Sequence, residues 1–166
     1  KAQSSPVHPV RIDPTAVSLV GTVDLKTDNP IKLPTSVTAA LLDNGYVVRA
    51  WESLDPGERL IGTAALFTES LQPASAVVPY TDRWKDELIA YNTALPFANG
   101  NILLAWIDRR DQKGKFVLYD SRMKIIKGPV VFSPKNAHRF SVVRLPGGTS
   151  ALIAFYEPGR PASDAL

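Results

Sequence analysis

Short apolar segments alternate along the chain with breaks made of Gly, Pro, Asn and Asp, and the breaks recur about every ten residues. The apolar segments are rich in Val, Ile, Leu, Tyr and Phe and lack the period of about 3.6 residues that marks an amphipathic helix. The pattern therefore predicts an all-β fold of short antiparallel strands. The predicted strands cover residues 34–42, 46–51, 59–68, 75–80, 88–95, 102–107, 115–120, 125–132, 140–144 and 150–156.

A tight turn followed by an apolar strand occurs three times, and the copies are evenly spaced. The aligned strands contain Ala50-Trp51, Ala105-Trp106 and Ala154-Phe155, so the copies are 55 and 49 residues apart. The preceding turns are Asn44-Gly45, Asn99-Gly100 and Gly147-Gly148. For Asn44-Gly45 we expect a type I′ hairpin turn, because both central residues tolerate positive φ. A period of about 50 residues is that of one four-stranded supersecondary repeat.

Two further matches extend the repeat. Residues 66–72 match residues 118–124 at an offset of 52, with apolar, aromatic and polar classes agreeing position by position. Residues 21–28 match residues 62–69, so the N-terminal segment resembles the third and fourth strands of a repeat whose first half is absent before it. The predicted strands therefore group as two, four, four and two.

The pattern over residues 21–157 resembles a β-propeller, in which a four-stranded blade of ~40–55 residues repeats around an axis and both termini often contribute to the last blade. The specific resemblance is to bacterial repeats with an Asn-Gly turn, an apolar strand and a terminal Ala-Trp, which occur in secreted, cell-surface and lectin-like proteins. It implies four-stranded antiparallel blades, about three blades' worth, with two complete and one split between the termini. Because closed propellers have about four to eight blades, either the chain belongs to a longer protein, which we prefer, or identical chains complete the ring.

The resemblance also implies a division of the chain. The segments are an N-terminal Pro-rich arm or linker (1–14), a half blade (15–33), two blades (34–82 and 88–134), a half blade (137–157) and a C-terminal linker (158–166).

The composition is that of a soluble globular protein, with 45% hydrophobic and 21% charged residues among 166. The net charge is +3, but the basic residues are scattered and interrupted by acidic ones, so we expect no nucleic-acid partner. No apolar run reaches about 18 residues, so we expect no membrane span. The chain has no cysteine, which excludes disulfide bonds. It starts at Lys1 rather than Met, as a processed product or an internal fragment would.

Charged and aromatic side chains gather where the second strand of each repeat gives way to a loop. A rigid β scaffold commonly displays its binding residues in such loops. An aromatic ring offers an apolar platform to the face of a sugar, while carboxylate and guanidinium groups bond to its hydroxyls. The alternative is that Trp51, Trp106 and Phe155 only pack one repeat against the next. The candidate ligand-binding residues are Trp51, Glu52, Trp84, Trp106, Asp108, Arg109, Tyr156 and Glu157.

The sequence shows no catalytic or metal-binding motif. Glycoside hydrolysis needs two carboxylates at a suitable separation. The available acids are Glu52, Asp55, Asp108, Asp111 and Glu157. Nothing in the sequence places two of them face to face, and the Ser-x-Asp-x-Gly-x-Thr-Trp box of sialidase-like propellers does not occur. His8 and His138 have no second ligand at useful spacing, so we expect no metal, no cofactor and no catalytic residue.

The sequence thus favours a secreted or cell-surface binding or adhesion module that recognises a glycan or a protein ligand without chemical turnover. A structural domain of a large assembly, such as a surface layer, a fibre or a phage virion, is the second hypothesis, and a glycoside hydrolase is the third. A glycan binder should have an exposed aromatic ring in a concave loop pocket. An assembly protein should have a large apolar contact surface, and a hydrolase should have a close carboxylate pair.

Overall fold

In a computed structural model of the chain, the described residues are 10–13, 18–22, 37–54, 56–57, 59–84, 89–133 and 136–156. Their regular secondary structure consists of twelve β-strands and includes no helix. The all-β prediction is therefore confirmed for this part of the chain. The chain divides into two compact units, Lys1–Pro34 and Thr35–Leu166.

The N-terminal unit contains an antiparallel hairpin of β1 (Val10–Asp13) and β2 (Ser18–Thr22). β1 lies inside the segment 1–14, for which the sequence predicts an arm or linker, and β2 lies inside the predicted half blade 15–33. The other residues of these two segments, His8 among them, and the predicted linker 158–166 lie outside the described residues.

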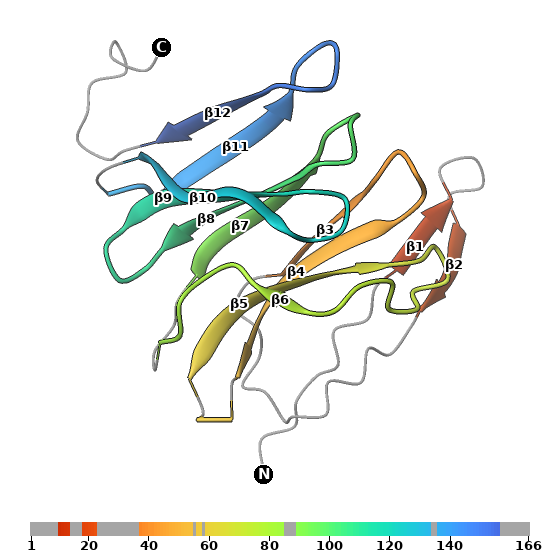
Figure 1. Cartoon of the computed structure of the whole chain (residues 1–166), viewed down its shortest axis with the longest axis horizontal. Helices are drawn as coiled ribbons and strands as arrows, with labels where there is room; N and C mark the ends of the chain where they lie inside the picture. Colours follow the sequence, from red (N-terminus) through yellow and green to blue (C-terminus); the bar gives the residue numbers. More distant parts are fainter. Residues whose placement is uncertain are drawn as a thin grey trace. The chain divides into compact units, whose positions relative to one another are not determined.

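The C-terminal unit consists of three antiparallel sheets, and in each sheet every strand pairs with the next one along the chain (Figure 1). Sheet I contains β3 (Val37–Leu41), β4 (Val47–Leu54), β5 (Leu60–Phe67) and β6 (Val78–Pro79). Sheet II contains β7 (Ile89–Pro96), β8 (Ile102–Asp108), β9 (Lys113–Tyr119) and β10 (Ile125–Ser133). Sheet III contains β11 (Arg139–Arg144) and β12 (Ala151–Tyr156). The predicted four-stranded antiparallel sheets are confirmed, and the described residues form no closed ring.

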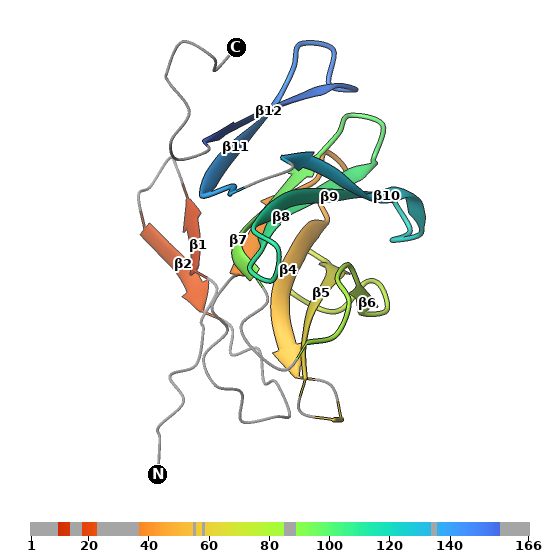
Figure 2. The same ribbon diagram turned by 90° about the vertical axis from the view of Figure 1, so that its left-hand side faces the viewer.

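Sheet II lies between sheet I and sheet III, as both views of the ribbon show (Figure 1, Figure 2). Successive side chains of a strand point to opposite faces of its sheet, and every residue of β8 is buried. Its side chains at 102, 104 and 106 join a core cluster with residues of sheet I, such as Val48 and Leu66. Its side chains at 103, 105 and 107 join a second cluster with residues of sheet III, such as Phe140. A strand covered on both faces is expected to be apolar throughout, which explains the run Ile-Leu-Leu-Ala-Trp-Ile.

The turn between β3 and β4 differs from the predicted type I′ turn. Gly45 has a φ of 84°, but Asn44 is not among the residues with positive φ. The loop is closed by hydrogen bonds from the Leu42 amide to the Tyr46 carbonyl (2.7 Å) and from the Gly45 amide to the Leu42 carbonyl (3.0 Å). It is therefore a three-residue loop that ends in one left-handed glycine. The side-chain oxygen of Asn44 stabilises the loop by accepting a hydrogen bond from the Tyr46 amide at 3.2 Å.

The repeated segments 66–72 and 118–124 form the same kind of loop. The Leu71 amide donates to the Thr68 carbonyl (2.9 Å), and the Met123 amide donates to the Asp120 carbonyl (3.0 Å). Leu71 and Met123 occupy the left-handed position, with φ of 61° and 63°. Met123 is 4% exposed and belongs to the core between sheets I and II. Burial of this side chain offsets a backbone conformation that favours glycine.

Candidate functional site

The topology of the C-terminal unit brings several loops to one end, which we call the loop end. It comprises the start of β7, the turn between β8 and β9, and residues 136–138 with the start of β11. The first residue of β7, Ile89, pairs with the last residue of β8, Asp108. The segment before β11 is tied to the turn after β8 by a hydrogen bond from the Ala137 amide to the Gln112 carbonyl (2.8 Å). Residues distant in sequence therefore share this surface.

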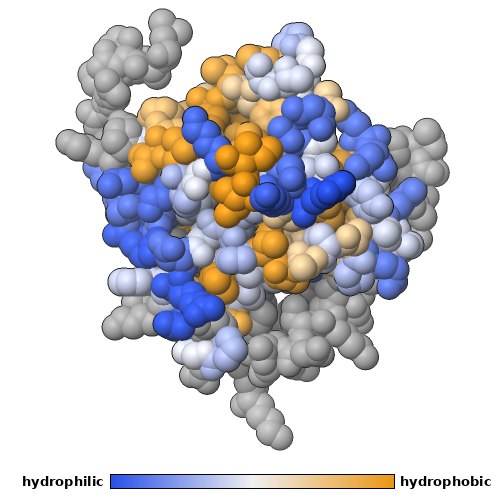
Figure 3. Space-filling model, in the orientation of Figure 1, coloured by the Kyte–Doolittle hydropathy of each residue, from blue (hydrophilic) through white to orange (hydrophobic). Residues whose placement is uncertain are grey.

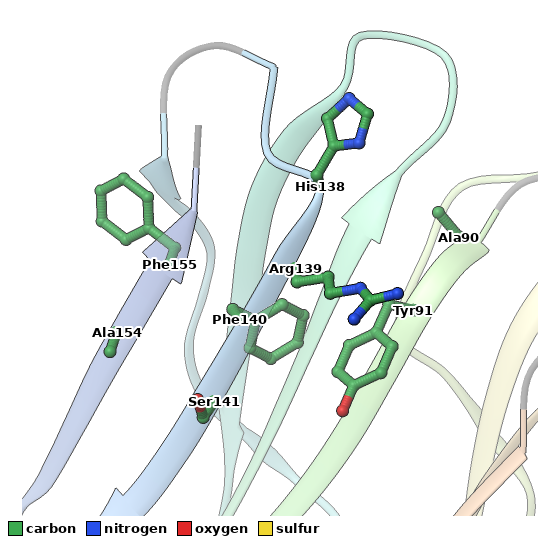
Figure 4. Close-up of a pocket in the computed structure, with 8 residues that line it drawn as sticks. All are labelled: Ala90, Tyr91, His138, Arg139, Phe140, Ser141, Ala154 and Phe155. Atoms are coloured by element: carbon green, nitrogen blue, oxygen red, sulfur yellow. The ribbon is translucent and has the colours of Figure 1, made fainter. Parts of the chain in front are cut away.

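An open pocket of about 620 Å³ lies at the loop end, between the starts of β7 and β11 (Figure 4). Strand β7 contributes Ala90 and Tyr91 to its lining, and β12 contributes Ala154 and Phe155. The segment that enters and begins β11 contributes His138, Arg139, Phe140 and Ser141. The pocket is thus built by the junction of sheets II and III.

Aromatic rings make the apolar wall of the pocket. Tyr91 is 45% exposed and Phe155 is 36% exposed, whereas Phe140 is 5% exposed. The rings of Tyr91 and Phe140 meet edge to face, with centroids 5.0 Å apart and planes at 88°. Phe132 of β10 lies behind them, with its ring centroid 5.3 Å from that of Phe140 and 5.9 Å from that of Phe155. These contacts hold the exposed rings against the core.

The polar groups of the pocket are basic or neutral. His138 and Arg139 are exposed, and Ser141 adds a hydroxyl. Figure 4 shows the Arg139 side chain extending from β11 toward Tyr91 on β7. The described lining residues include no aspartate or glutamate. The pocket therefore combines apolar ring surface with the cationic donors of Arg139.

A second feature of the loop end is an ionic cluster around Asp108, the last residue of β8. Its fully buried carboxylate accepts hydrogen bonds from Arg110 Nε at 2.8 Å, from Arg110 Nη2 and from Lys115 Nζ at 2.8 Å. Burial by itself would raise the pKa of Asp108, but the hydrogen bonds from Arg110 and Lys115 outweigh burial and keep this pKa below its ordinary value. The Arg110 guanidinium also lies over the Trp84 ring, 5.6 Å from its centroid.

The ionic cluster does not supply the acid that glycoside hydrolysis needs. Lys115 Nζ lies 2.8 Å from a carboxylate oxygen of Asp108 and 2.9 Å from one of Asp111, so the ammonium group bridges the two acids. A hydrolase requires one carboxyl group whose pKa is raised enough to donate a proton. Arg110 and Lys115 instead stabilise the anionic form of Asp108, which suits a residue that fixes the turn after β8.

The structure separates the predicted ligand-binding residues into three groups. Trp84, Asp108 and Arg109 lie at the loop end, where Arg110 connects the first two. Trp84 is 39% exposed and Arg109 is exposed. The side chain of Tyr156, and the residues Glu157 and Asp55, lie outside the described part of the chain.

The remaining predicted residues lie between or on the sheets. Glu52 is 1% exposed, and its Oε1 accepts from the Ile89 amide at 2.8 Å, which joins sheet I to the start of β7. Trp106 is 1% exposed and packs edge to face on Tyr80, with centroids 5.3 Å apart. Trp51 is half-buried, 6.5 Å from the Phe67 ring and beneath the Arg49 guanidinium at 5.0 Å. Buried side chains such as Glu52 and Trp106 offer no surface to a ligand in this conformation.

The aligned second strands point to Phe155, which lines the pocket, but not to the pocket residues of β7 and β11. In an antiparallel sheet, the end of the second strand lies beside the start of the first. The starts of β7 and β11 therefore reach the same end of the unit. An aromatic or basic residue at the start of a first strand, such as Tyr91 or Arg139, is the signal that would have identified them.

The described residues contain neither a metal-holding group nor a membrane-spanning helix. No group of three His, Cys, Asp or Glu side chains there is arranged to hold a metal ion. No helix in this part of the chain is long and apolar enough to cross a membrane.

Comparison with protein-family models, curated proteins and solved structures finds no match to this chain. Functional inference therefore depends on the geometry of the loop end.

Proposed function

We propose that this chain is a non-catalytic binding module, secreted or displayed at a cell surface, that recognises a glycan in the pocket between β7 and β11. The observation that carries the proposal is the exposed Tyr91 ring in a concave pocket at the loop end. Ligand sites in proteins are typically concave and largely apolar, with a few polar groups that fix orientation. Tyr91 supplies the apolar platform, and Arg139 and Ser141 supply the hydrogen-bonding groups.

We also propose that the sheets of the C-terminal unit are propeller-type blades. The contacts between sheets support this arrangement, because β7, the first strand of sheet II, contacts both β3 and β11, the first strands of the other two sheets. First strands that neighbour one another are expected around a propeller axis. The proposed pocket would then lie beside that axis, at the junction of two blades.

Isothermal titration of the purified chain with a panel of oligosaccharides tests the proposed function. Tyr91→Ala should weaken binding by about tenfold or more, because stacked aromatic contacts contribute on the order of 1 kcal/mol beyond the area that they bury. Tyr46→Ala is the matched control. Tyr46 is also an exposed tyrosine (39%), but it lies beside the turn between β3 and β4, away from the loop end. Circular dichroism should show that both variants keep the strand signal. Absence of binding to every glycan, or equal binding by both variants, would reject the proposal.

A second candidate function, a structural role in an assembly, is favoured by the free edge of sheet III. Strands β4 and β8 are paired on both sides, whereas β12 pairs only with β11 among the described strands. The register of β12 is unbroken over six residue pairs, and its sequence Ala-Leu-Ile-Ala-Phe-Tyr contains no charge and no proline. Such an edge can accept a further strand from a partner.

The outer edges of sheets I and II are protected. At the outer edge of sheet I, β6 has only two residues and one of them is Pro79. At the outer edge of sheet II, the pairing of β10 with β9 shifts register three times, and β10 contains Pro129. Short strands, prolines and bulges are common means of preventing edge-to-edge association. Because β12 lacks these protections, we expect assembly to occur through the edge of β12. The solution mass of the chain tests this expectation.

A further inference from the structure

We propose that the ligand of the pocket carries a carboxylate, so that the glycan is an acidic one, and that Arg139 binds this carboxylate. The inference rests on the proposed function and specifies its ligand class. It follows from the charge of the lining, the state of Arg139 and the position of Arg139 relative to the ring wall.

The described lining residues include basic side chains but no acidic side chain that would neutralise them. The basic side chains are those of His138 and Arg139. Two other arginines of the unit have carboxylate partners: Arg110 is held by Asp108, and Arg144 lies 3.4 Å from Asp43. Within the described part of the chain, Arg139 forms no ion pair. A guanidinium group left open to a pocket is complementary to an anionic ligand.

The geometry places this charge beside groups that suit a sugar. Arg139 and Ser141 are two residues apart on β11, so their side chains project to the same face, about 7 Å apart along the strand. Phe155 pairs with Phe140 across the hairpin and therefore lies on the opposite face of sheet III. The Tyr91 ring of β7, which is 45% exposed, lies on the side toward which Arg139 extends (Figure 4). A guanidinium fork can donate two parallel hydrogen bonds to one carboxylate. A ring with an acid group could therefore place its carboxylate at Arg139 and a hydroxyl at Ser141 while one face covers an aromatic platform.

The experiment compares acidic oligosaccharides with their own neutral forms. The probes are oligogalacturonate, a glucuronate-containing oligosaccharide and sialyllactose, each measured beside the same molecule after reduction of its carboxyl groups to alcohols. For at least one pair, the acidic form should bind about tenfold more tightly or better, which corresponds to about 1.4 kcal/mol. Arg139→Gln should remove most of this preference. Arg122→Gln, at an exposed arginine in the turn between β9 and β10, should leave it unchanged.

The other outcomes distinguish a failure of the carboxylate inference from a failure of the proposed function. If acidic and reduced forms bind equally, the proposed function stands and the carboxylate inference fails. A preference for the acidic form that survives Arg139→Gln would place the anion elsewhere and would also overturn the inference. Equal binding of polyglutamate would show that charge alone is recognised, which rejects an acidic sugar as the ligand. If no probe and no neutral glycan binds, the proposed function itself is wrong.

Discussion

Gly114 of β9 lies directly beneath the ring of Phe132 of β10, so closely that a Cβ atom at position 114 would overlap the ring. Sheet I contains the same relationship, because a Cβ at Gly62 of β5 would come within 2.7 Å of the Tyr80 ring. Both pairs are related by the offset of 52 residues that relates segments 66–72 and 118–124. The repeat is therefore a repeat of packing as well as of strand pattern, with a third-strand glycine covered by an aromatic ring that follows in the chain.

Gly114→Ala should destabilise the chain by about 1–3 kcal/mol, because the added methyl group must displace a packed ring. Strain in the backbone does not contribute, since Gly114 lies outside the left-handed region. Urea unfolding followed by tryptophan fluorescence measures the change. In a Phe132→Ala background the same substitution should cost much less, and equal costs in both backgrounds would contradict the packing account.

The strand pattern could be predicted from the sequence because each strand is short, apolar and bounded by turn residues. The type I′ turn at Asn44 was wrong, because the Asn side chain caps the loop locally while only Gly45 takes positive φ. A propensity rule for two residues could not anticipate a loop of three. The left-handed Met123 was equally invisible, since its side chain is fixed there by the core between sheets.

The candidate site was less predictable than the fold because it is assembled from three strands. Tyr91 and Arg139 come together only through the packing of sheet II on sheet III (Figure 4). The sequence does not distinguish the aromatic residues at aligned positions. In the structure, however, β8 is covered on both faces and Trp106 is buried, whereas Phe155 on the last strand is 36% exposed. The difference comes from the number of neighbouring sheets, which no local pattern records.

Acid should destabilise the chain partly through Asp108, whose folded-state pKa is lowered by Arg110 and Lys115 despite burial. The unfolded carboxylate takes up a proton first, near pH ~3.9, so this stability is present above that pH and is lost as the pH falls through the lower folded value. Asp108→Asn should cost about 2 kcal/mol at pH 7, less than the ~3–5 kcal/mol of a fully buried pair because Arg110 is partly exposed.

Urea unfolding of Asp108→Asn at a series of pH values checks this expectation. The variant should show a flatter loss of stability than the wild type between pH ~5 and ~2. Asp43→Asn is the control, because Asp43 forms an exposed ion pair with Arg144 at 3.4 Å and should contribute less than about 1 kcal/mol. Parallel profiles for Asp108→Asn and the wild type would exclude the ionic cluster as a source of acid sensitivity.

Alkaline conditions should destabilise the chain through Tyr119, because burial raises the pKa of this phenol to about 12. A raised folded pKa means that the stability is present below the unfolded value of ~10 and is lost as the pH rises through the folded value. Tyr119→Phe should therefore lose less stability than the wild type between pH ~10 and ~12. At pH 7 it should be weaker by about 1 kcal/mol, since the hydroxyl donates to the Pro79 carbonyl at 2.9 Å. Equal alkaline slopes for the two proteins would contradict the assignment.

The solution mass of the chain should depend on the exposed face and edge of sheet III. Leu152 and Val143 are cross-strand partners, and each is 57% exposed, so apolar surface continues along the hairpin to the free edge of β12 (Figure 3). Light scattering of a self-associating chain should give about twice 18.1 kDa or more.

Leu152→Lys should return the mass to that of the monomer, because a charge beside an edge strand opposes pairing with another strand. Ile125→Lys is the control, since Ile125 is 51% exposed on the protected β10 edge and its replacement should leave the mass unchanged. A wild-type mass of 18.1 kDa at every concentration would remove self-assembly through β12 as a function.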